Sequence, residues 1–224
     1  MTAKTPQRPS RSATGPTSPA TGMVAVPSTL WAAGSKPFDP DDRWPEPILS
    51  RAVREFCVPG GRALLIGWPT PTTRGGLHVA EPDTAAALVT VAALGRHGVS
   101  EPDPGAGEPV DLVVVSLLAD HFDPVGAADR VAGLGVERLA MGGLLVVLGR
   151  CRHSGEGVLV DPAGAVVAAA QAADLLYLQH IIAVPVTGHT ITATAAADAL
   201  APSAGRHVVA HADVFVFLQP SAQD

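Results

Sequence analysis

The sequence is poor in lysine, cysteine and long hydrophobic runs, and each shortage excludes a class of protein. The only lysines are Lys4 and Lys36, so the body of the chain has none for a phosphate-binding loop. Its two cysteines, Cys57 and Cys151, form no C-x-x-C pair. This usage is typical of a reducing compartment, and we expect a cytoplasmic protein. No apolar run approaches the roughly 20 residues that span a bilayer, so no membrane segment is predicted.

Acidic residues are absent from residues 1–38, which carry four basic residues. Residues 39–224 carry a formal net charge of −10, and such a body repels a phosphate backbone. Any contact with DNA would therefore need a local basic patch or the basic tail. Residues 1–28 are rich in Pro, Ser, Thr and Gly, which predicts a disordered tail. We expect one domain over residues 29–220 and a short tail at 221–224.

Segments with strand character and segments with helix character alternate along the body of the chain. The unbroken β-branched run at 110–116 is typical of a parallel strand covered on both faces. Asp123-Pro124 and Asp161-Pro162 each place a capping carboxylate before a proline, which predicts helices that start near 124 and 162. Strands are predicted at 62–67, 77–83, 110–116, 142–149, 175–184 and 207–219, and further helices at 46–56 and 83–97.

This alternation predicts the fold class. Strands that alternate with helices indicate βαβ units and a mainly parallel sheet. No clear helix separates 175–184 from 207–219, so we expect these two strands to pair in antiparallel fashion at an edge of the sheet. The result is an α/β fold of three layers, with a Rossmann-like, mostly parallel sheet and an antiparallel C-terminal strand pair.

Five stretches support a narrower comparison. They are "STLWAAG" (28–34), "PGGRALLIG" (59–67), "DLVVVS" (111–116), "MGGLLVV" (141–147) and "HADVFVF" (211–217). In this order they resemble actinobacterial DNA methyltransferases, bacterial enzymes of the class I S-adenosylmethionine-dependent fold that methylate exocyclic amino groups of bases. The resemblance covers roughly residues 28–220 and implies S-adenosylmethionine as the cofactor.

The resemblance places the cofactor at the ends of the first two strands. Gly67 stands at the turn after the first strand, followed by Trp68 and two prolines in place of the family's acidic, Gly-rich loop. Glu81 and Asp83 follow the second predicted strand, where the family uses an acid to hold the ribose; Asp83 is also a candidate helix N-cap. Only nine residues separate Gly67 from the strand at 77, so the crossover helix is expected to be reduced or absent. Alternatively, 77–81 is a loop and 83–97 is that helix, displaced.

The family's fourth strand ends in Asp, Asn or Ser, two prolines and an aromatic residue, which orient a flipped base and stack on it. Ser116 takes the polar position here, but Leu117, Leu118 and Ala119 replace the rest of the motif. Candidates to replace its functions are Asp120 or His121 as acceptors and Phe122 as the stacking ring, although the more ordinary interpretation is that Asp120 and His121 are solvated loop residues.

Other kinds of site have little support in the sequence. His207, His211 and Asp213 are evenly spaced along one predicted strand, where parallel side chains diverge, so no metal site is predicted. Ser116 has no His in a nucleophile elbow, and "GAG" at 105–107 does not join a strand to a helix. Hydrolase and dinucleotide-binding functions are therefore disfavoured.

Two functional hypotheses remain. In the first, a methyltransferase-like protein has eroded cofactor and catalytic loops, is weakly active or non-catalytic, and binds a partner or regulates an active relative. DNA and an active methyltransferase relative are the candidate partners. In the second, the chain is an active S-adenosylmethionine-dependent N-methyltransferase on a base or a small molecule. Its site residues would then be Ser116, Asp120 and Phe122 for the acceptor and Gly67, Glu81 and Asp83 for the cofactor.

Overall fold

The computed structural model describes residues 29–39, 41–67, 82–100, 107–119, 123–154, 156, 158–192 and 210–221. In chain order its elements are β1 Leu30–Ala32, α1 Glu46–Phe56, β2 Arg62–Gly67, α2 Pro82–Ala93, β3 His97–Ser100, β4 Val110–Ser116, α3 Ala128–Arg138, β5 Leu139–Gly149, β6 Arg152–His153, β7 Leu159–Val160, α4 Ala163–Ala172, β8 Leu176–Val184, β9 Val186–Thr187, β10 Thr190–Ile191 and β11 Ala212–Leu218.

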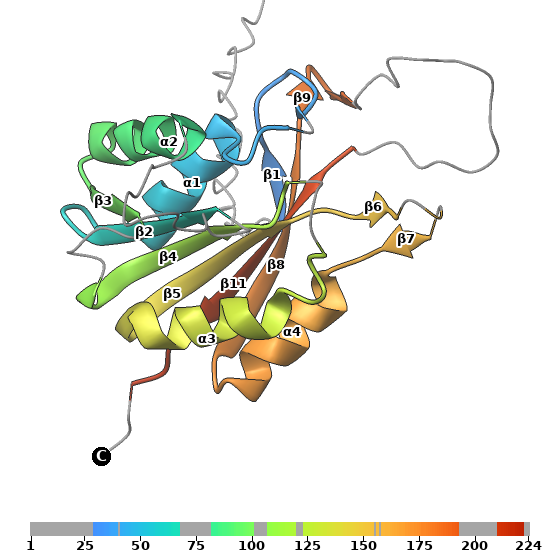
Figure 1. Cartoon of the computed structure of the whole chain (residues 1–224). Helices are drawn as coiled ribbons and strands as arrows, with labels where there is room; N and C mark the ends of the chain where they lie inside the picture. The colour runs from blue at the N-terminus through green and yellow to red at the C-terminus, as the bar shows by residue number, and fades with distance from the viewer. Residues whose placement is uncertain are drawn as a thin grey trace, which may run out of the picture.

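Seven strands form one sheet in the order β1, β8, β11, β5, β4, β2, β3 (Figure 1). All neighbours are parallel except β11, which runs antiparallel to both β8 and β5. The predicted fold class is confirmed, including the antiparallel pairing of the last two long strands. That pair does not lie at the edge, because β11 is inserted between β8 and β5, and β1 lies outside β8.

The sheet separates two apolar cores. On one face, Ile48 of α1 and Val91 of α2 pack on alternate strand residues such as Leu112. On the other face, side chains of α3 and α4 pack on the intervening residues, such as Val113 and Phe217. Because both faces of the central strands are covered, β2 and β4 are apolar at nearly every position, which explains why they show no alternation of apolar and polar residues.

Helix α1 and strands β2 and β4 have the predicted bounds, but the region between β2 and β4 differs from the prediction. The strand that pairs beside β2 is β3, and the predicted strand at 77–83 runs into α2, whose first residue is Pro82. Residues 77–81 lie outside the described part. Helix α2 is the crossover that was expected to be reduced, and it ends before Gly95, whose φ of 73° suits glycine.

The two Asp-Pro pairs begin their helices differently. The Asp161 carboxylate accepts a hydrogen bond from the Ala163 N–H at 2.9 Å, and α4 starts there, as predicted. The Asp123 carboxylate accepts one from the Val125 N–H at 3.0 Å, but residues 124–127 form turns and α3 begins only at Ala128. The predicted start near 124 is therefore four residues too early.

Two short antiparallel pairs project from the sheet, β6 with β7 and β9 with β10. Neither was predicted, since each strand has only two residues and its apolar pattern is too short to recognise. None of the helices in the described ranges is long and apolar enough to cross a membrane.

Candidate functional site

The carboxyl edge of the parallel strands is where open α/β sheets bind ligands. Gly67 is the last residue of β2 and Ser116 the last of β4, and the two are direct partners in the sheet. Ser116 also pairs with Leu148 of β5. The structure therefore brings together two of the predicted site residues, one from the cofactor group and one from the acceptor group.

The other two predicted cofactor residues, Glu81 and Asp83, do not follow the strand that pairs with β2. Asp83 is the second residue of α2 and not its N-cap, and its carboxylate accepts a hydrogen bond from the Thr84 N–H at 2.8 Å. Its other carboxylate oxygen lies 3.6 Å from Arg43 Nε. Glu81 lies outside the described residues. The parallel strand beside β2 is β3, so the end of the second strand is Ser100 rather than Glu81.

Residues 41–45, immediately before α1, lie across this edge. The Ser116 hydroxyl donates to the Arg43 carbonyl at 2.6 Å, and the Leu118 N–H reaches the same Ser116 oxygen at 3.4 Å. Ser116 is fully buried, so its hydroxyl has both roles filled inside the protein. A Cβ placed on Gly67 would lie 3.5 Å from Arg43 Nη1, which puts the Arg43 side chain against the end of β2.

Trp44 anchors this segment. Its indole Nε1–H donates to Thr84 Oγ1 at 3.1 Å, and the side chain is 5% exposed within the core on the α1 side. A buried indole with a satisfied N–H contributes a large apolar area to packing. The sequence analysis did not single out Arg43, Trp44 or Thr84. The signal that could have identified the anchor is the tryptophan in "DDRWP" (41–45), directly before the start of α1.

The three residues after Ser116 are buried. Leu117, Leu118 and Ala119 are 1%, 2% and 5% exposed. Leu117 packs in the core of α3 and α4 and Leu118 in the core of α1 and α2, while the Leu117 N–H continues the sheet to the Leu148 carbonyl at 2.8 Å. Asp120, His121 and Phe122 lie outside the described residues. The loop after β4, where the resemblance implies an acceptor site, therefore begins with residues that are packed in the core.

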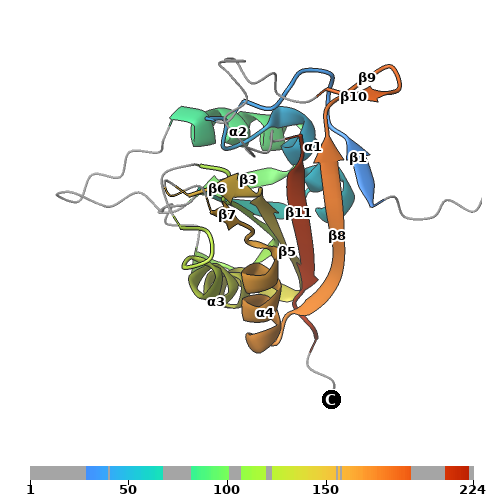
Figure 2. The ribbon, with the colours of Figure 1, turned by 90° about the vertical axis from the view of Figure 1, so that its right-hand side faces the viewer.

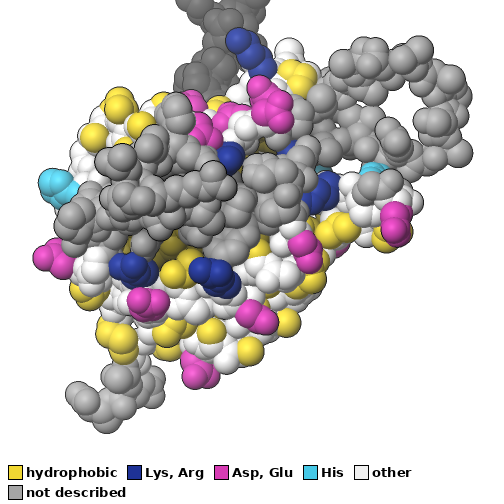
Figure 3. Space-filling view, in the orientation of Figure 1, with side chains coloured by type: hydrophobic (Ala, Val, Ile, Leu, Met, Phe, Trp, Pro, Cys, Tyr) yellow, Lys and Arg dark blue, Asp and Glu magenta, His cyan; other side chains and the backbone are white. Residues whose placement is uncertain are grey.

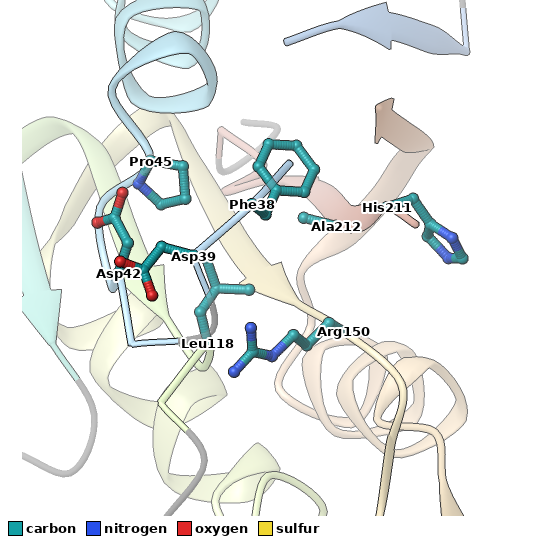
Figure 4. A pocket seen from close by; sticks show the side chains of 8 residues that line it. All are labelled: Phe38, Asp39, Asp42, Pro45, Leu118, Arg150, His211 and Ala212. Carbon is teal, nitrogen blue, oxygen red and sulfur yellow. The ribbon is translucent and has the colours of Figure 1, made fainter. Parts of the chain in front are cut away.

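A small hollow remains beside Leu118 (Figure 4). Its volume of about 10 Å³ is roughly that of one water molecule. Figure 4 shows Arg150 pointing toward Leu118, with the Asp39 and Asp42 carboxylates together on the other side. Burial raises the pKa of Asp42, the Trp44 N–H partly opposes this by hydrogen bonding, and the Asp39 and Asp83 charges raise it further. The hollow is lined by Phe38, Asp39, Asp42, Pro45, Leu118, Arg150, His211 and Ala212.

A second polar group lies at the start of β11. One oxygen of the buried Asp213 carboxylate lies 2.9 Å from His180 Nε2 and 3.5 Å from His211 Nε2. No three His, Cys, Asp or Glu side chains in the described ranges are placed to hold a metal ion.

Nearby, burial raises the pKa of the Cys151 thiol to about 11, with the Asp161 and Asp213 charges adding to the effect. The raised pKa favours the protonated thiol over the thiolate at neutral pH.

The opposite, amino edge of the sheet has a larger groove of about 560 Å³. Its polar walls serve the fold: the Arg96 guanidinium donates to the Cys57 carbonyl at 2.9 Å, and the Asp111 carboxylate accepts from the Arg62 N–H at 2.8 Å. It lies away from the strand ends where the fold places chemistry. The groove is lined by Arg54, Glu55, Phe56, Cys57, Val58, Pro59, Arg96, Asp111, Met141, Gly142, Gly143 and Leu144.

No protein family and no curated protein matches the sequence. Among solved structures, the chain is similar to the N-methyltransferase NodS from Bradyrhizobium japonicum WM9, at 14% identity over 82% of this chain and 98% of that one, with a TM-score of 0.44. The [4+2]-cyclase SpnF matches at 15% identity over 85% and 88% of the two chains, with a TM-score of 0.47. A TehB-like SAM-dependent methyltransferase from Corynebacterium glutamicum matches at 12% over 76% and 86%, with a TM-score of 0.37.

Likenesses this distant say nothing of what this chain does. The fold class is established by the strand order itself, with β11 antiparallel between β8 and β5. Function has to be argued from the carboxyl edge, because unrelated chemistries share one fold. The described part of that edge consists of Ser116, whose hydroxyl is hydrogen-bonded to Arg43, the buried residues 117–119, and residues 41–45, which lie across the strand ends.

Proposed function

We propose that this chain is a methyltransferase-like protein that does not transfer methyl groups and acts by binding a partner. One observation carries the proposal: the described residues at the end of β4 are engaged with the rest of the chain. The Ser116 hydroxyl donates a hydrogen bond to the Arg43 carbonyl, and the Leu117 and Leu118 side chains are packed in the two apolar cores. A catalytic acceptor site needs the opposite arrangement, with a polar group facing a cleft that admits the substrate.

The hollow described beside Leu118 is too small for S-adenosylmethionine. Pockets for ligands of this size usually have volumes of about 300–1,000 Å³, whereas the hollow beside Leu118 has about 10 Å³. The Arg43 side chain lies against Gly67, where the resemblance would bring the methionine part of the donor close to the backbone. We therefore assign Ser116 a structural role and Gly67 no cofactor role.

An active methyltransferase relative is a better candidate partner than DNA. Residues 39–224 carry a formal net charge of −10, which disfavours a phosphate backbone. On the face seen in Figure 3, Lys and Arg side chains lie apart from one another among Asp and Glu, and the described part of this face carries no basic cluster. A protein surface tolerates this mixture of charges, because interface rims are polar.

Calorimetric titration of the full chain with S-adenosylmethionine and with S-adenosylhomocysteine tests the loss of the cofactor site. We expect no binding tighter than millimolar, because the donor's place is filled. A micromolar dissociation constant for either compound would contradict the proposal. A Trp44→Ala variant, titrated in parallel, shows whether the crossing segment is what excludes the donor.

A transfer assay separates this proposal from an active enzyme. Methyl-labelled donor is incubated with the chain and with DNA, RNA or cell extract, and a catalytically sound relative serves as the positive control. We expect label transfer only by the relative, and a change in its rate when the chain is added in excess. Label transferred by the chain alone would instead establish the active N-methyltransferase.

A further inference from the structure

The groove at the amino edge of the sheet has the size of a ligand pocket. Its volume of about 560 Å³ falls within the roughly 300–1,000 Å³ of pockets that hold small organic molecules. One wall is the end of α1 with the turn that follows it, and the other is the first part of β5. Figure 2 shows α1 on the face of the sheet opposite α3 and α4, so the helical wall belongs to the α1 side of the molecule.

The backbone of β5 keeps this groove open. Gly142 has a φ of 80°, a conformation that residues with a side chain rarely adopt. A Cβ placed on Gly143 would lie 2.9 Å from the Ala140 carbonyl oxygen, so a side chain there would force the backbone to shift. Gln219 holds the stretch in place, because the Gly142 N–H donates to its carbonyl and its own N–H donates to the Gly143 carbonyl, both at 2.9 Å. The groove is therefore preformed by the fold.

The charges that line the groove do not cancel. The Glu55 carboxylate pairs with Arg51 at 2.7 Å, so these two residues together are neutral. The other charged residues of the lining are Arg54, Arg96 and Asp111, which are two positive charges and one negative. The lining thus carries a single net positive charge, in a body whose formal net charge is −10. Such a site attracts a ligand with one negative charge.

Both arginines keep N–H donors that a ligand can use. A guanidinium has five N–H donors. Arg96 uses three of them, from Nε and Nη2 to the Cys57 carbonyl at 3.2 and 2.9 Å and from Nη1 to the Leu94 carbonyl at 2.5 Å. Arg54 has no hydrogen-bond or ion-pair partner among the described residues. Guanidinium groups with spare donors are suited to a carboxylate or sulfonate, because charge-assisted hydrogen bonds are the stronger kind.

Each wall also exposes an apolar side chain, Val58 after α1 and Met141 in β5, at 62% and 56%. We infer that the groove binds an organic acid with one negative charge and an apolar body. The acid group accepts hydrogen bonds from Arg54 and Arg96, and the body covers Val58 and Met141. A ligand with two negative charges would leave one of them unmatched beside Asp111. This site is separate from the carboxyl edge and does not depend on the proposed function.

Titration of the full chain with anilinonaphthalene sulfonate tests the site, since this fluorescent probe has one negative charge and an apolar ring system. We expect a single saturable site at micromolar probe. Octanoate should displace the probe, whereas acetate lacks the apolar body and octyltrimethylammonium has the opposite charge, so neither should compete. No saturable binding at submillimolar probe, or displacement by acetate or octyltrimethylammonium as strong as by octanoate, would overturn the inference.

Two arginine variants locate the acid group. Arg54→Gln should weaken probe binding about tenfold, because a hydrogen bond to a charged group contributes roughly that factor. Arg130→Gln is the matched control, since it removes the same charge from an exposed position of α3 outside the groove. Equal affinity of the Arg54→Gln variant and the parent chain would overturn the inference.

A second pair of variants locates the apolar body. Met141→Glu should weaken binding at least about tenfold, because it replaces apolar surface by a like charge. Leu159→Glu is its control, at a 48% exposed position of β7. All four substituted positions are exposed, so the melting temperatures should match that of the parent, which separates loss of the site from loss of the fold. Binding that Met141→Glu leaves intact would place the probe elsewhere and overturn the inference.

Discussion

The hollows lined by described residues at the two edges of the same sheet differ in volume. At the carboxyl edge, beside Leu118, the hollow measures about 10 Å³; at the amino edge, the groove between α1 and β5 measures about 560 Å³. The cause lies in the residues. Phe38, Pro45 and Leu118 line the hollow at the first edge, whereas the groove at the second is lined in part by Gly142 and Gly143, which have no side chain.

The comparison teaches that the largest hollow does not by itself mark the functional site. Strand direction places ligands of this fold at the carboxyl edge, so we give topology more weight than volume. At that edge, the described residues Ser116, Leu117 and Leu118 are buried. Substitutions at the two edges should therefore have unequal effects on stability, and they measure how tightly the described residues of the carboxyl edge are packed.

The largest effect is expected for Trp44→Ala. It removes a buried ring and its hydrogen bond to Thr84, so the free energy of unfolding should fall by about 3–5 kcal/mol. Val58→Ala is the control at the amino edge, where the side chain is 62% exposed and a change within about 0.5 kcal/mol is expected. Urea denaturation measures both. A loss below about 1 kcal/mol for Trp44→Ala would mean that the segment is not docked.

Leu118→Ala should cost somewhat less, about 2–5 kcal/mol, because it leaves a cavity next to the existing hollow. Met141→Ala, at a 56% exposed position beside the groove, should have almost no effect. Thermal unfolding of the two variants compares the edges directly. Equal melting temperatures would show that the carboxyl edge is as open as the amino edge.

Ser116→Ala tests whether the hydroxyl is structural. The Arg43 carbonyl would lose its donor in a buried place, at a cost of about 1–2 kcal/mol in unfolding free energy. Thr90→Ala is the matched control, since the Thr90 hydroxyl bonds only within α2 at 3.5 Å and should cost less. A variant as stable as the parent chain would argue that Ser116 is free for another role.

The smallest effect concerns the charge of Asp42, whose pKa burial raises above its ordinary value of 3.8. A raised pKa means that the folded protein binds the proton more tightly than the unfolded chain does, so ionised Asp42 opposes folding at neutral pH. Asp42→Asn should therefore stabilise the protein at pH 7, and the gain should vanish as the pH falls to the ordinary value. Calorimetric melting at several pH values measures this.

The control for Asp42→Asn is Glu55→Gln at the amino edge. Glu55 pairs on the surface with Arg51 at 2.7 Å, so losing its charge should lower stability slightly at pH 7. Effects of opposite sign at the two edges are the expected outcome. A destabilising Asp42→Asn would show that the carboxylate has a stabilising partner.

Strongly patterned elements were predictable from the sequence. Three elements have the bounds that their sequence predicts. They are α1, with an apolar stripe between its proline start and the following "VPGG", the short apolar run of β2 and the β-branched run of β4. Strand β3 was missed because His97 and Gly98 match a helix end as well as they match a short edge strand. Only the pairing with β2 distinguishes the two, and pairing is a long-range property.

The candidate site was predictable in part. Strand ends can be read locally, so the meeting of Gly67 and Ser116 followed from their positions at the ends of two parallel strands. The replacement of the family's motif by Leu117, Leu118 and Ala119 was equally visible. The crossing of residues 41–45 was not, because the Ser116–Arg43 bond joins residues 73 positions apart and neither residue is unusual alone.

The sequence by itself determined the alternation of strands and helices, the polar residue at the end of β4 and the neutral stretch at 175–191, because composition and periodicity are local properties. The tertiary structure alone decided that the Arg43 carbonyl accepts from the Ser116 hydroxyl and that β1, in the described part of the chain, pairs only with Ile182–Val184 of β8. Both depend on which distant segments come to lie side by side, and many arrangements share the same local pattern.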